Sequence, residues 1–365
     1  MTSTFRIERR LDADPRVAAL SRLGGAVAAM VVAGIVLLLT GRNPFSLLID
    51  AFDAVFGSGS RGFEGVALRA IPILMCALGV ALSLRMRVWN IGSDGQFLVG
   101  ALAAVGVGIH WDGPHWLVLI VMALVATLAG ALWMLIPALA RAYWDVNEII
   151  TTLLMNFVAV ELVNWAALSF WRDEEAQVVQ STPPVKAVLA AFPGSDAVSI
   201  AIVVPILIAG VLWWLFRSTT VGYEIDTIGG NPRAATFIGV NVRRRVMVVM
   251  LVTGAIAGLG GMLQLSSPGA QRLGTGFSAQ YGLSGFIVAS LAGGSFIGLL
   301  GGGFFIAAMF YSGIVLRTQG LSTYIVFAIY GVILLGIAIG EVAARYRLVR
   351  TTPAPAAGEL GGATT

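Results

Sequence analysis

A cluster of hydrogen-bonding residues lies within the most apolar part of this sequence. Asn90, Asp94 and Gln96 are interleaved with two glycines directly before a long apolar run. Amide and carboxylate groups inside a membrane segment are costly unless they face protein, water or a ligand. A helix that begins here presents free backbone N–H groups. The cluster fits contact with a polar solute, but a purely structural helix start with Asp94 as a first-turn acid explains the same residues.

Other polar residues interrupt the apolar runs further along the chain. Asn156, Glu161 and Gln264 lie inside such runs, and glycines divide the stretch 282–316. Glu161 is interpreted either as a cavity residue or as a satisfied helix–helix contact. Helices interrupted at corresponding places in two halves of a chain are typical of a transport path. The candidate path or gate residues are Asn90, Asp94, Gln96, Asn156, Gln264, Gln280 and Ser284.

A second group of residues suits binding to a protein. The interval 217–245 carries five arginines between two apolar runs, which predicts a loop at the cytoplasmic face of a membrane. Within it, Asn231 as N-cap, Pro232 at the first helical position and Gly239 as a stop predict a short helix outside the membrane. The residues expected to contact a partner are Asn231, Pro232, Arg233, Ala234, Ala235, Thr236 and Gly239.

The residues that most enzymes and metal sites require are missing from the sequence. There is no G-x-x-x-x-G-K-[ST] loop to bind phosphate, and the one lysine, Lys186, lies elsewhere. His110 and His115 share a short loop, where a metal site is conceivable but solvated histidines are the usual case. No nucleophile–base pair is available within the apolar runs. We therefore predict neither a catalytic site nor a metal site.

Composition identifies an integral membrane protein of all-α fold. Hydrophobic residues make up 58% of the chain and charged residues 12%, whereas a soluble domain is about a quarter charged. The net charge of +4 needs no nucleic acid, because arginines gather beside membrane segments. Ten apolar runs predict about ten transmembrane helices. They are 23–40, 66–84, 91–109, 116–140, 149–170, 198–216, 246–265, 282–300, 303–316 and 321–340, of which 303–316 is short for a full span.

The basic residues favour a topology with both ends in the cytoplasm. In that arrangement 16 of the 23 Lys and Arg residues fall on the inner side and 6 on the outer side. Residues 1–22 are then a basic cytoplasmic arm, 23–340 one transmembrane domain and 341–365 a disordered cytoplasmic tail. The outer loops 171–197 and 266–280 are either solvated connectors or contact surfaces for a soluble partner.

The two halves of the chain resemble each other. Segment 77–84 resembles 258–265, and segment 91–96 resembles 281–286, mainly at glycine and leucine positions. In the ten-span topology the two halves run in opposite directions, so the repeat would be inverted. Chance similarity between runs rich in glycine and leucine explains the pattern equally well.

Three motifs resemble those of a known family. Asn-Ile-Gly-Ser-Asp-Gly-Gln at 90–96 is similar to the signature of membrane permeases of bacterial ATP-binding-cassette (ABC) importers for nucleosides, ribose-type sugars and branched-chain amino acids. The segments 147–159 and 230–240 resemble the nucleoside branch in particular. Asp94 stands where a glutamate is common, and 292–298 is unusually rich in glycine, which leaves the fine substrate open.

The resemblance implies a ten-helix permease similar to the vitamin-importer type and located in the bacterial cytoplasmic (inner) membrane. Two such subunits, often different but homologous chains, would form the pore. Two cytoplasmic ABC ATPase subunits would bind ATP and Mg²⁺, and the short helix at 231–239 would couple to them. An extracytoplasmic binding protein or lipoprotein would deliver the small-molecule substrate. This chain itself would bind no cofactor.

The function that the resemblance implies is a translocation path for nucleosides. Ribose-type simple sugars are the alternative within the same importer class. A stand-alone secondary transporter is the alternative from another class, with Asp94 and Glu161 as ion-coupling carboxylates. An intramembrane enzyme is the remotest of these hypotheses, because the nucleophile–base pair is lacking.

Overall fold

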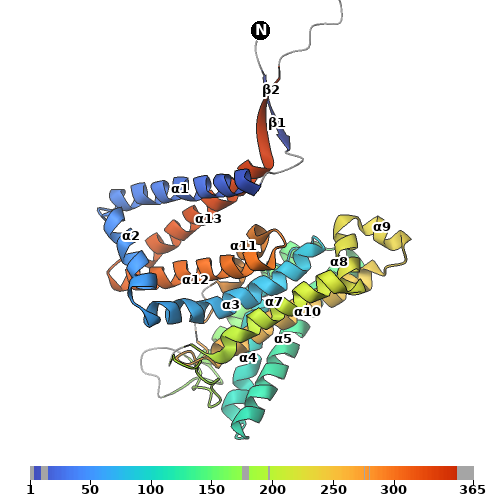
Figure 1. The fold of residues 1–365 in the computed structure, drawn as a ribbon. Helices are drawn as coiled ribbons and strands as arrows, with labels where there is room; N and C mark the ends of the chain where they lie inside the picture. The colour runs from blue at the N-terminus through green and yellow to red at the C-terminus, as the bar shows by residue number, and fades with distance from the viewer. Residues whose placement is uncertain are drawn as a thin grey trace, which may run out of the picture. The chain divides into compact units, whose positions relative to one another are not determined.

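The computed structural model describes residues 4–9, 15–174, 181–195, 198–274, 276–278 and 280–351, and nearly all of its regular structure is α-helical (Figure 1). The helices are α1 Pro15–Leu39, α2 Pro44–Phe52, α3 Ser60–Arg85, α4 Ser93–His110, α5 His115–Trp144, α6 Glu148–Leu168, α7 Val203–Ser218, α8 Thr220–Gly230, α9 Pro232–Phe237, α10 Val242–Leu265, α11 Tyr281–Ala292, α12 Phe296–Thr318 and α13 Thr323–Arg345.

Seven helices in the described part of the chain are long and apolar enough to cross a membrane. They are Ser60–Arg85, His115–Trp144, Glu148–Leu168, Ile200–Ser218, Val242–Leu265, Phe296–Thr318 and Thr323–Ala344. Leu23–Leu39 and Tyr281–Ala292 are shorter apolar helices. The chain is therefore a multi-pass membrane protein. The predicted count of ten spans and the predicted topology stay predictions.

The last part of the membrane domain is divided differently from the prediction. The sequence placed a break between apolar runs at 300–303, but the chain remains helical through Gly301–Gly303. The break lies at Gly293 and Gly294, whose φ angles of +58° and +89° are open to glycine and strained for other residues. The run 303–316 is consequently not short, because its helix α12 begins at Phe296.

The chain forms two compact units, one of residues Met1–Asp50 and Leu316–Thr365 and one of Ala51–Val315. In the first unit α1 packs along α13, where Gly25 faces the backbone of Gly336 and admits no side chain. Strand β1 (Thr4–Arg9) pairs antiparallel with strand β2 (Tyr346–Thr351), which the all-α prediction did not include. The predicted arm at 1–22 and tail at 341–365 fall partly outside the described residues.

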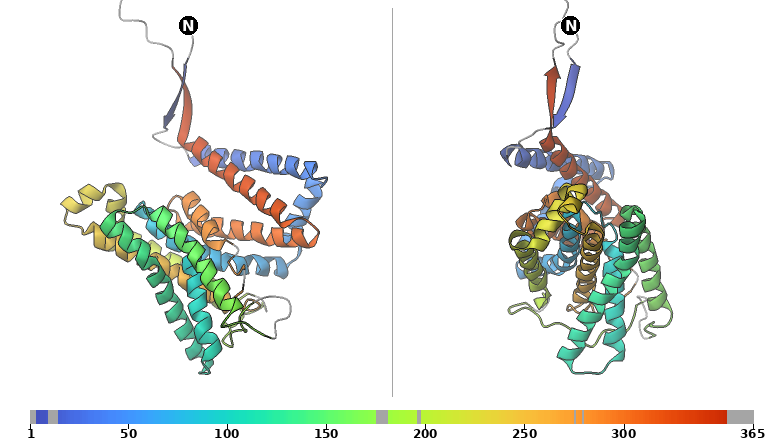
Figure 2. Two further views of the ribbon diagram at one scale, coloured as in Figure 1. Left: turned by 180° about the vertical axis from the view of Figure 1, so that it is seen from behind. Right: turned by 90° about the vertical axis from the view of Figure 1, so that its right-hand side faces the viewer.

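The second unit is built around α3 and α10, which pack against each other. The middle of α3 is fully buried, from Ala70 to Val80. Helix α10 also packs on α4 and α5, and α11 packs on α3 (Figures 1 and 2). A side chain at Gly258 would overlap the α5 backbone at Ala126, and a side chain at Gly100 of α4 would overlap the Gly258 backbone, so the close approach of these helices requires glycine at both positions.

The two longest predicted outer loops lie against each other in the second unit. The Thr182 N–H donates to the Leu273 carbonyl at 2.8 Å, and the Val185 N–H donates to that of Gln271 at 2.9 Å. Lys186 forms an ion pair with Asp112, in the loop that carries both histidines. The loop 171–197 thus contacts both of the other loops that the predicted topology puts on the same side of the membrane.

Candidate functional site

The start of α11 lies inside the second unit and is capped by Asp94, which comes from the start of α4. The carboxylate accepts hydrogen bonds from the Gly282 N–H at 2.8 Å, the Leu283 N–H at 3.1 Å and the Ser278 hydroxyl at 2.6 Å. A helix start leaves backbone N–H groups without intrahelical partners and carries a partial positive charge. Asp94 supplies both the acceptors and the negative charge, so its carboxylate stabilises the start of α11.

The start of α4 is capped in turn by Asn156 from α6. The Asn156 side-chain oxygen accepts from the Gly95 N–H at 2.8 Å, and its amide nitrogen donates to the Ile91 carbonyl at 2.9 Å. A side chain at Gly282 would overlap the backbone at Asp94, so the starts of α4 and α11 lie in direct contact. Two helix starts therefore meet here, and each takes its cap from a different helix.

Asn90 and Gln96 form a buried amide pair beneath this junction. Each side chain donates to the other at 3.0 Å, and Asn90 also accepts from the Gly92 N–H at 3.0 Å. The Gln96 amide makes a further contact with the Met134 sulfur. Both side chains are buried, and their hydrogen bonds shape the loop before α4.

A cavity of about 270 Å³ lies beside the two helix starts. Its polar lining comprises Asp94, Asn156, Asn164, Ser278 and Gln280, and its apolar lining includes Phe157 and Phe277. The volume is near the lower end of the range for small-molecule pockets, and a few convergent polar groups on an apolar wall are typical of such sites. Three predicted path residues, Asp94, Asn156 and Gln280, thus meet at one cavity.

The remaining predicted path residues lie away from this cavity. Ser284 is buried within α11, and Gln264 is half-buried near the end of α10. The Gln264 side-chain oxygen is buried without a hydrogen-bond partner in the described part of the chain. Glu161 is exposed on α6. The aromatic wall of the cavity was not predicted, because a phenylalanine in an apolar run carries no signal that separates lining from packing.

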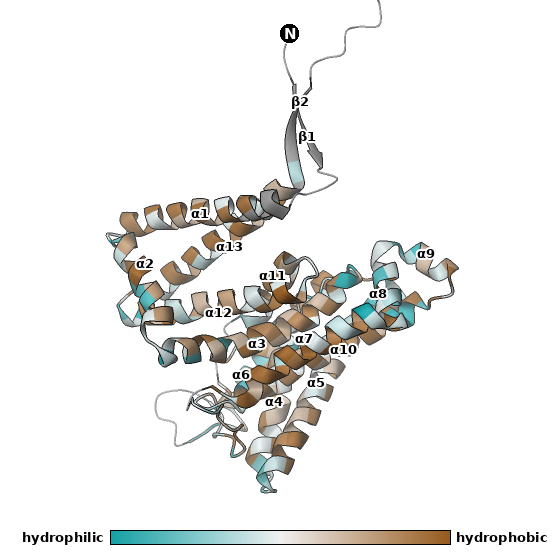
Figure 3. Cartoon of the chain, in the orientation of Figure 1, coloured by the Kyte–Doolittle hydropathy of each residue, from teal (hydrophilic) through white to brown (hydrophobic). Residues whose placement is uncertain are grey.

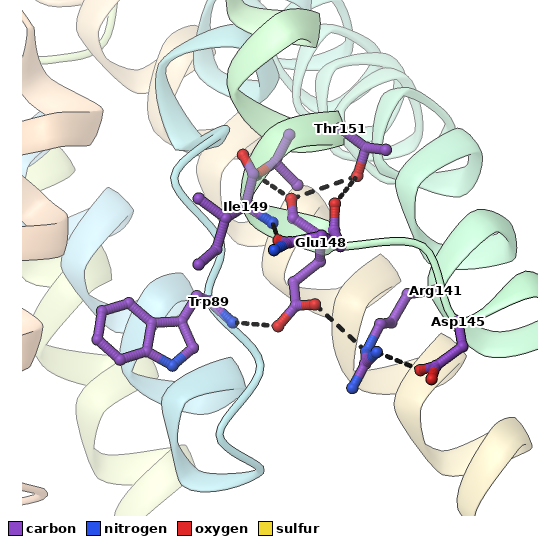
Figure 4. A network of polar contacts seen from close by, with 8 residues as sticks. Trp89, Arg141, Asp145, Glu148, Ile149 and Thr151 are labelled. Carbon is purple, nitrogen blue, oxygen red and sulfur yellow. Dashed lines mark hydrogen bonds and ion pairs between the residues drawn. The ribbon is translucent and has the colours of Figure 1, made fainter.

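A polar network that the sequence analysis did not identify fixes the loop before α4 (Figure 4). The buried Glu148 carboxylate accepts from the Trp89 N–H at 3.2 Å and lies 3.3 Å from the Arg141 Nε. Arg141 also pairs with Asp145 at the end of α5. Glu148 follows the N-cap Asn147, so the only sequence signal was a helix start. The network joins α5, α6 and the segment that leads to the Asp94 junction.

The predicted short helix outside the apolar bundle is confirmed as α9. The Asn231 side chain accepts from the Arg233 N–H at 3.0 Å and the Ala234 N–H at 3.2 Å, with Pro232 at the first helical position. Gly239 has a φ of +88° and follows the end of α9. Helices α8 and α9 form a hairpin in which hydrophilic residues gather (Figure 3).

The exposed surface of α9 differs in part from the predicted contact residues. Ala235 is fully buried, whereas Phe237 is 92% exposed and Ile238 is also exposed. Ala234 and Arg233 are exposed as predicted. Exposed phenylalanine and isoleucine side by side on a polar hairpin favour an apolar contact with a partner. The predicted contact residues include Thr236 and Gly239 on either side of this pair but neither Phe237 nor Ile238.

A buried junction of helix starts beside a polar-lined cavity, in a multi-pass membrane protein with an exposed capped hairpin, is the architecture of a membrane permease. The chain belongs to the family described as branched-chain amino acid transport system / permease component, whose model matches residues 62–346. This range includes the cavity, the junction and the α8–α9 hairpin. No solved structure is significantly similar to the chain.

Three characterised relatives cover most of the chain. It is 30% identical to the guanosine ABC transporter permease protein NupP of Bacillus subtilis, over 74% of this chain and 78% of that protein. It is 30% identical to the glucose ABC transporter permease protein TsgB13 of Haloferax volcanii, over 88% and 87%. It is 25% identical to the nucleoside ABC transporter permease protein NupB of Lactococcus lactis, over 74% and 77%.

Proposed function

We propose that this chain is the membrane-spanning permease subunit of an ATP-driven ABC importer for nucleosides, in the cytoplasmic membrane of a bacterium. The observation that carries the proposal is the cavity at the α4–α11 junction. Its one charged lining residue, Asp94, is engaged in capping α11, and the other polar groups are amides and a hydroxyl. A neutral solute with several hydroxyl and ring-nitrogen groups suits such a lining better than an ion does.

The aromatic residues of the cavity favour a base-containing substrate. Phe157 and Phe277 lie on its wall, and Asn164 and Gln280 provide both donors and acceptors. A nucleobase has a planar face for aromatic contact and polar edges for amides. The names of two of the three relatives, a guanosine permease and a nucleoside permease, support the same class of substrate.

The proposed assembly places a partner on each exposed surface. ATPase subunits, which would bind ATP and Mg²⁺, would dock on α9. A second permease chain would cover the apolar face of α6, where Ile150, Leu154 and Phe157 are exposed. An extracytoplasmic binding protein would approach the paired outer loops. The chain itself would bind no cofactor and no metal.

Ten spans with inverted halves are part of the proposal. Helix α4 packs on α10, and α11 packs on α3. A two-fold axis that relates α3 to α10 and α4 to α11 would convert the first contact into the second. The convergence of the α4 and α11 starts near that axis supports the same relation. The short α11, about 18 Å long for its 12 residues, is then the interrupted helix of the second half.

Simple sugars are the second candidate substrate. The glucose permease of Haloferax volcanii is 30% identical over 88% of this chain, a longer match than that of either nucleoside relative. Sugars would use the same amides and hydroxyl but would gain less from the two phenylalanines.

The test is uptake by the complex purified from its native membrane and reconstituted into liposomes. We expect ATP-dependent uptake of labelled guanosine that unlabelled nucleosides compete and glucose does not. ATP-dependent uptake of labelled glucose without uptake of guanosine would replace nucleosides by sugars. Uptake by this chain alone, without ATP and driven by a proton or sodium gradient, would overturn the importer and favour a secondary transporter.

A further inference from the structure

Arg85, the last residue of α3, connects the α8–α9 hairpin to the break between α11 and α12. One guanidinium nitrogen lies 3.3 Å from the Asp226 carboxylate on α8. Another donates to the Gly294 carbonyl at 2.9 Å, within the break. One side chain thus contacts two elements that are far apart in the sequence.

Aromatic contacts parallel this bridge. The Arg85 guanidinium lies over the ring of Phe216 on α7, 4.7 Å from its centre. Phe216 in turn stacks on Phe296, the first residue of α12, with ring centres 6.1 Å apart. Arginine over an aromatic face is attracted by the ring electrons, and the attraction strengthens when water is excluded. The arginine is therefore held in place from three directions.

Arg85 lies between open space and a tight helix contact. Two cavities of about 300 Å³ and 360 Å³ flank it, and both are lined by Arg85, Gly294, Ser295 and Phe296. On the other side α8 packs tightly, because a side chain at Gly229 would overlap the Arg85 carbonyl. A displacement of α8 is thus passed to the end of α3 by direct contact and across the open space by the guanidinium.

We infer that Arg85 is a positioning residue that transmits movement of the α8–α9 hairpin to the α11–α12 break. Helix α11 carries Asp94's hydrogen-bond partners at its start and the Gly293–Gly294 break at its end. A pull on Gly294 therefore acts on the helix whose start lies at the cavity. The inference rests on the proposed function, in which ATPase subunits move the hairpin.

The linkage is tested with Arg85→Gln and Asp226→Ala in the complete complex reconstituted into liposomes. We expect each variant to hydrolyse ATP while uptake of guanosine per ATP falls about tenfold, the size of a typical coupling between sites. Asp226→Ala removes only the contact between Arg85 and α8. It therefore tests the inference even if the Arg85 variant fails to assemble. Arg217→Gln is the matched control, because it removes a charge from the same cavity and leaves the bridge intact.

A second readout separates the linkage from the transported substrate. In a Cys76→Ser background, a spin label on Ser290→Cys, an exposed position of α11, reports movement of that helix. We expect ATP to change its spectrum in the parent and in Arg217→Gln but not in Arg85→Gln. A spectrum that still responds in Arg85→Gln, or an uptake-to-ATP ratio equal to that of the parent, would overturn the linkage. A parent complex without guanosine uptake would count against the proposed function alone.

Discussion

Asp94 places a negative charge inside a membrane domain, which needs a physical reason. Its carboxylate receives three hydrogen bonds, two of them from the first N–H groups of α11. Hydrogen bonds to a charged acceptor are stronger than neutral ones, and the helix dipole adds to them. The charge is thus stabilised by the helix that it caps. Asp94 therefore has a structural role, the capping of a helix other than its own, and it also lines the cavity, while its contact with a solute stays a prediction.

A first prediction separates these two roles of Asp94. Asp94→Asn keeps one acceptor oxygen for the α11 start, so we expect uptake to fall only a few-fold. Asp94→Ala leaves the N–H groups of Gly282 and Leu283 without acceptors and should lower the free energy of unfolding by about 1–3 kcal/mol. Thermal denaturation of the purified complex, with uptake measured in parallel, checks both. Ser278→Ala, which removes only the hydroxyl donor, is the control for stability, and its unfolding temperature should remain near that of the parent.

Two outcomes would contradict this assignment. Equal unfolding temperatures for the Ala and Asn variants would show that capping contributes nothing. Complete loss of uptake in Asp94→Asn with an intact complex would show that the charge itself acts in transport.

At the level of residues, the sequence predicted a set of polar path residues but not the hydrogen-bond partners of each. Asn90 and Gln96 satisfy each other, whereas Asn156 reaches across to cap another helix. These partners lie six and 61 positions away in the chain. No periodicity encodes such pairings, because they are set by the tertiary packing of α4 against α6.

Among the elements, the capped helix α9 was predictable and the α11–α12 break was not. The N-cap and the first-turn proline of α9 act locally, so their signal is complete in the sequence. The stretch 293–303 contains six glycines, and each could end a helix. Only Gly293 and Gly294 adopt the left-handed conformation. Which glycines do so is decided by contacts such as that between Arg85 and Gly294.

The second prediction concerns the exposed surface of α9. Phe237 is the most exposed large apolar side chain of the hairpin, and aromatic anchors of this kind carry much of the binding energy of an interface. Phe237→Ala should weaken ATPase binding by about 2 kcal/mol, or roughly 30-fold, without loss of membrane insertion. Titration of the purified permease with ATPase subunits measures it. Phe63→Ala, which truncates an exposed phenylalanine at the far end of α3, is the matched control.

Ala235 gives the same experiment an internal comparison. Because Ala235 is buried, a bulky residue there should disturb the hairpin itself, whereas a bulky residue at the exposed Ala234 should disturb only docking. Unchanged ATPase affinity in Phe237→Ala would remove α9 as the docking element, and equal loss in Phe63→Ala would indicate a general defect.

For the whole molecule, charge and contact agree on which segments share a side. The loops at 110–115, 171–197 and 266–280 are joined by hydrogen bonds and by the Lys186–Asp112 pair. At the other end, Arg85 reaches Asp226 and Glu224 pairs with Arg245. The positive-inside distribution predicted the first set as outer and the second as inner. Which set lies inside and which outside stays a prediction, because it depends on the charge sum over many residues, whereas the contacts show only which segments lie together.

The last prediction tests this topology with single cysteines in a Cys76→Ser background. One helix of membrane length, Ile200–Ser218, separates Lys186 from Phe237, so the predicted topology places Lys186→Cys and Phe237→Cys on opposite faces. A membrane-impermeant maleimide added to intact cells should label Lys186→Cys and spare Phe237→Cys. Tyr346→Cys, at the start of β2, should behave like Phe237→Cys, because the predicted topology places an even number of crossings between them. Labelling of Tyr346→Cys from outside would require an odd number of crossings between Phe237 and Tyr346. The helix that fails to complete a crossing would then be α11, which at about 18 Å is too short to cross a core of about 30 Å alone.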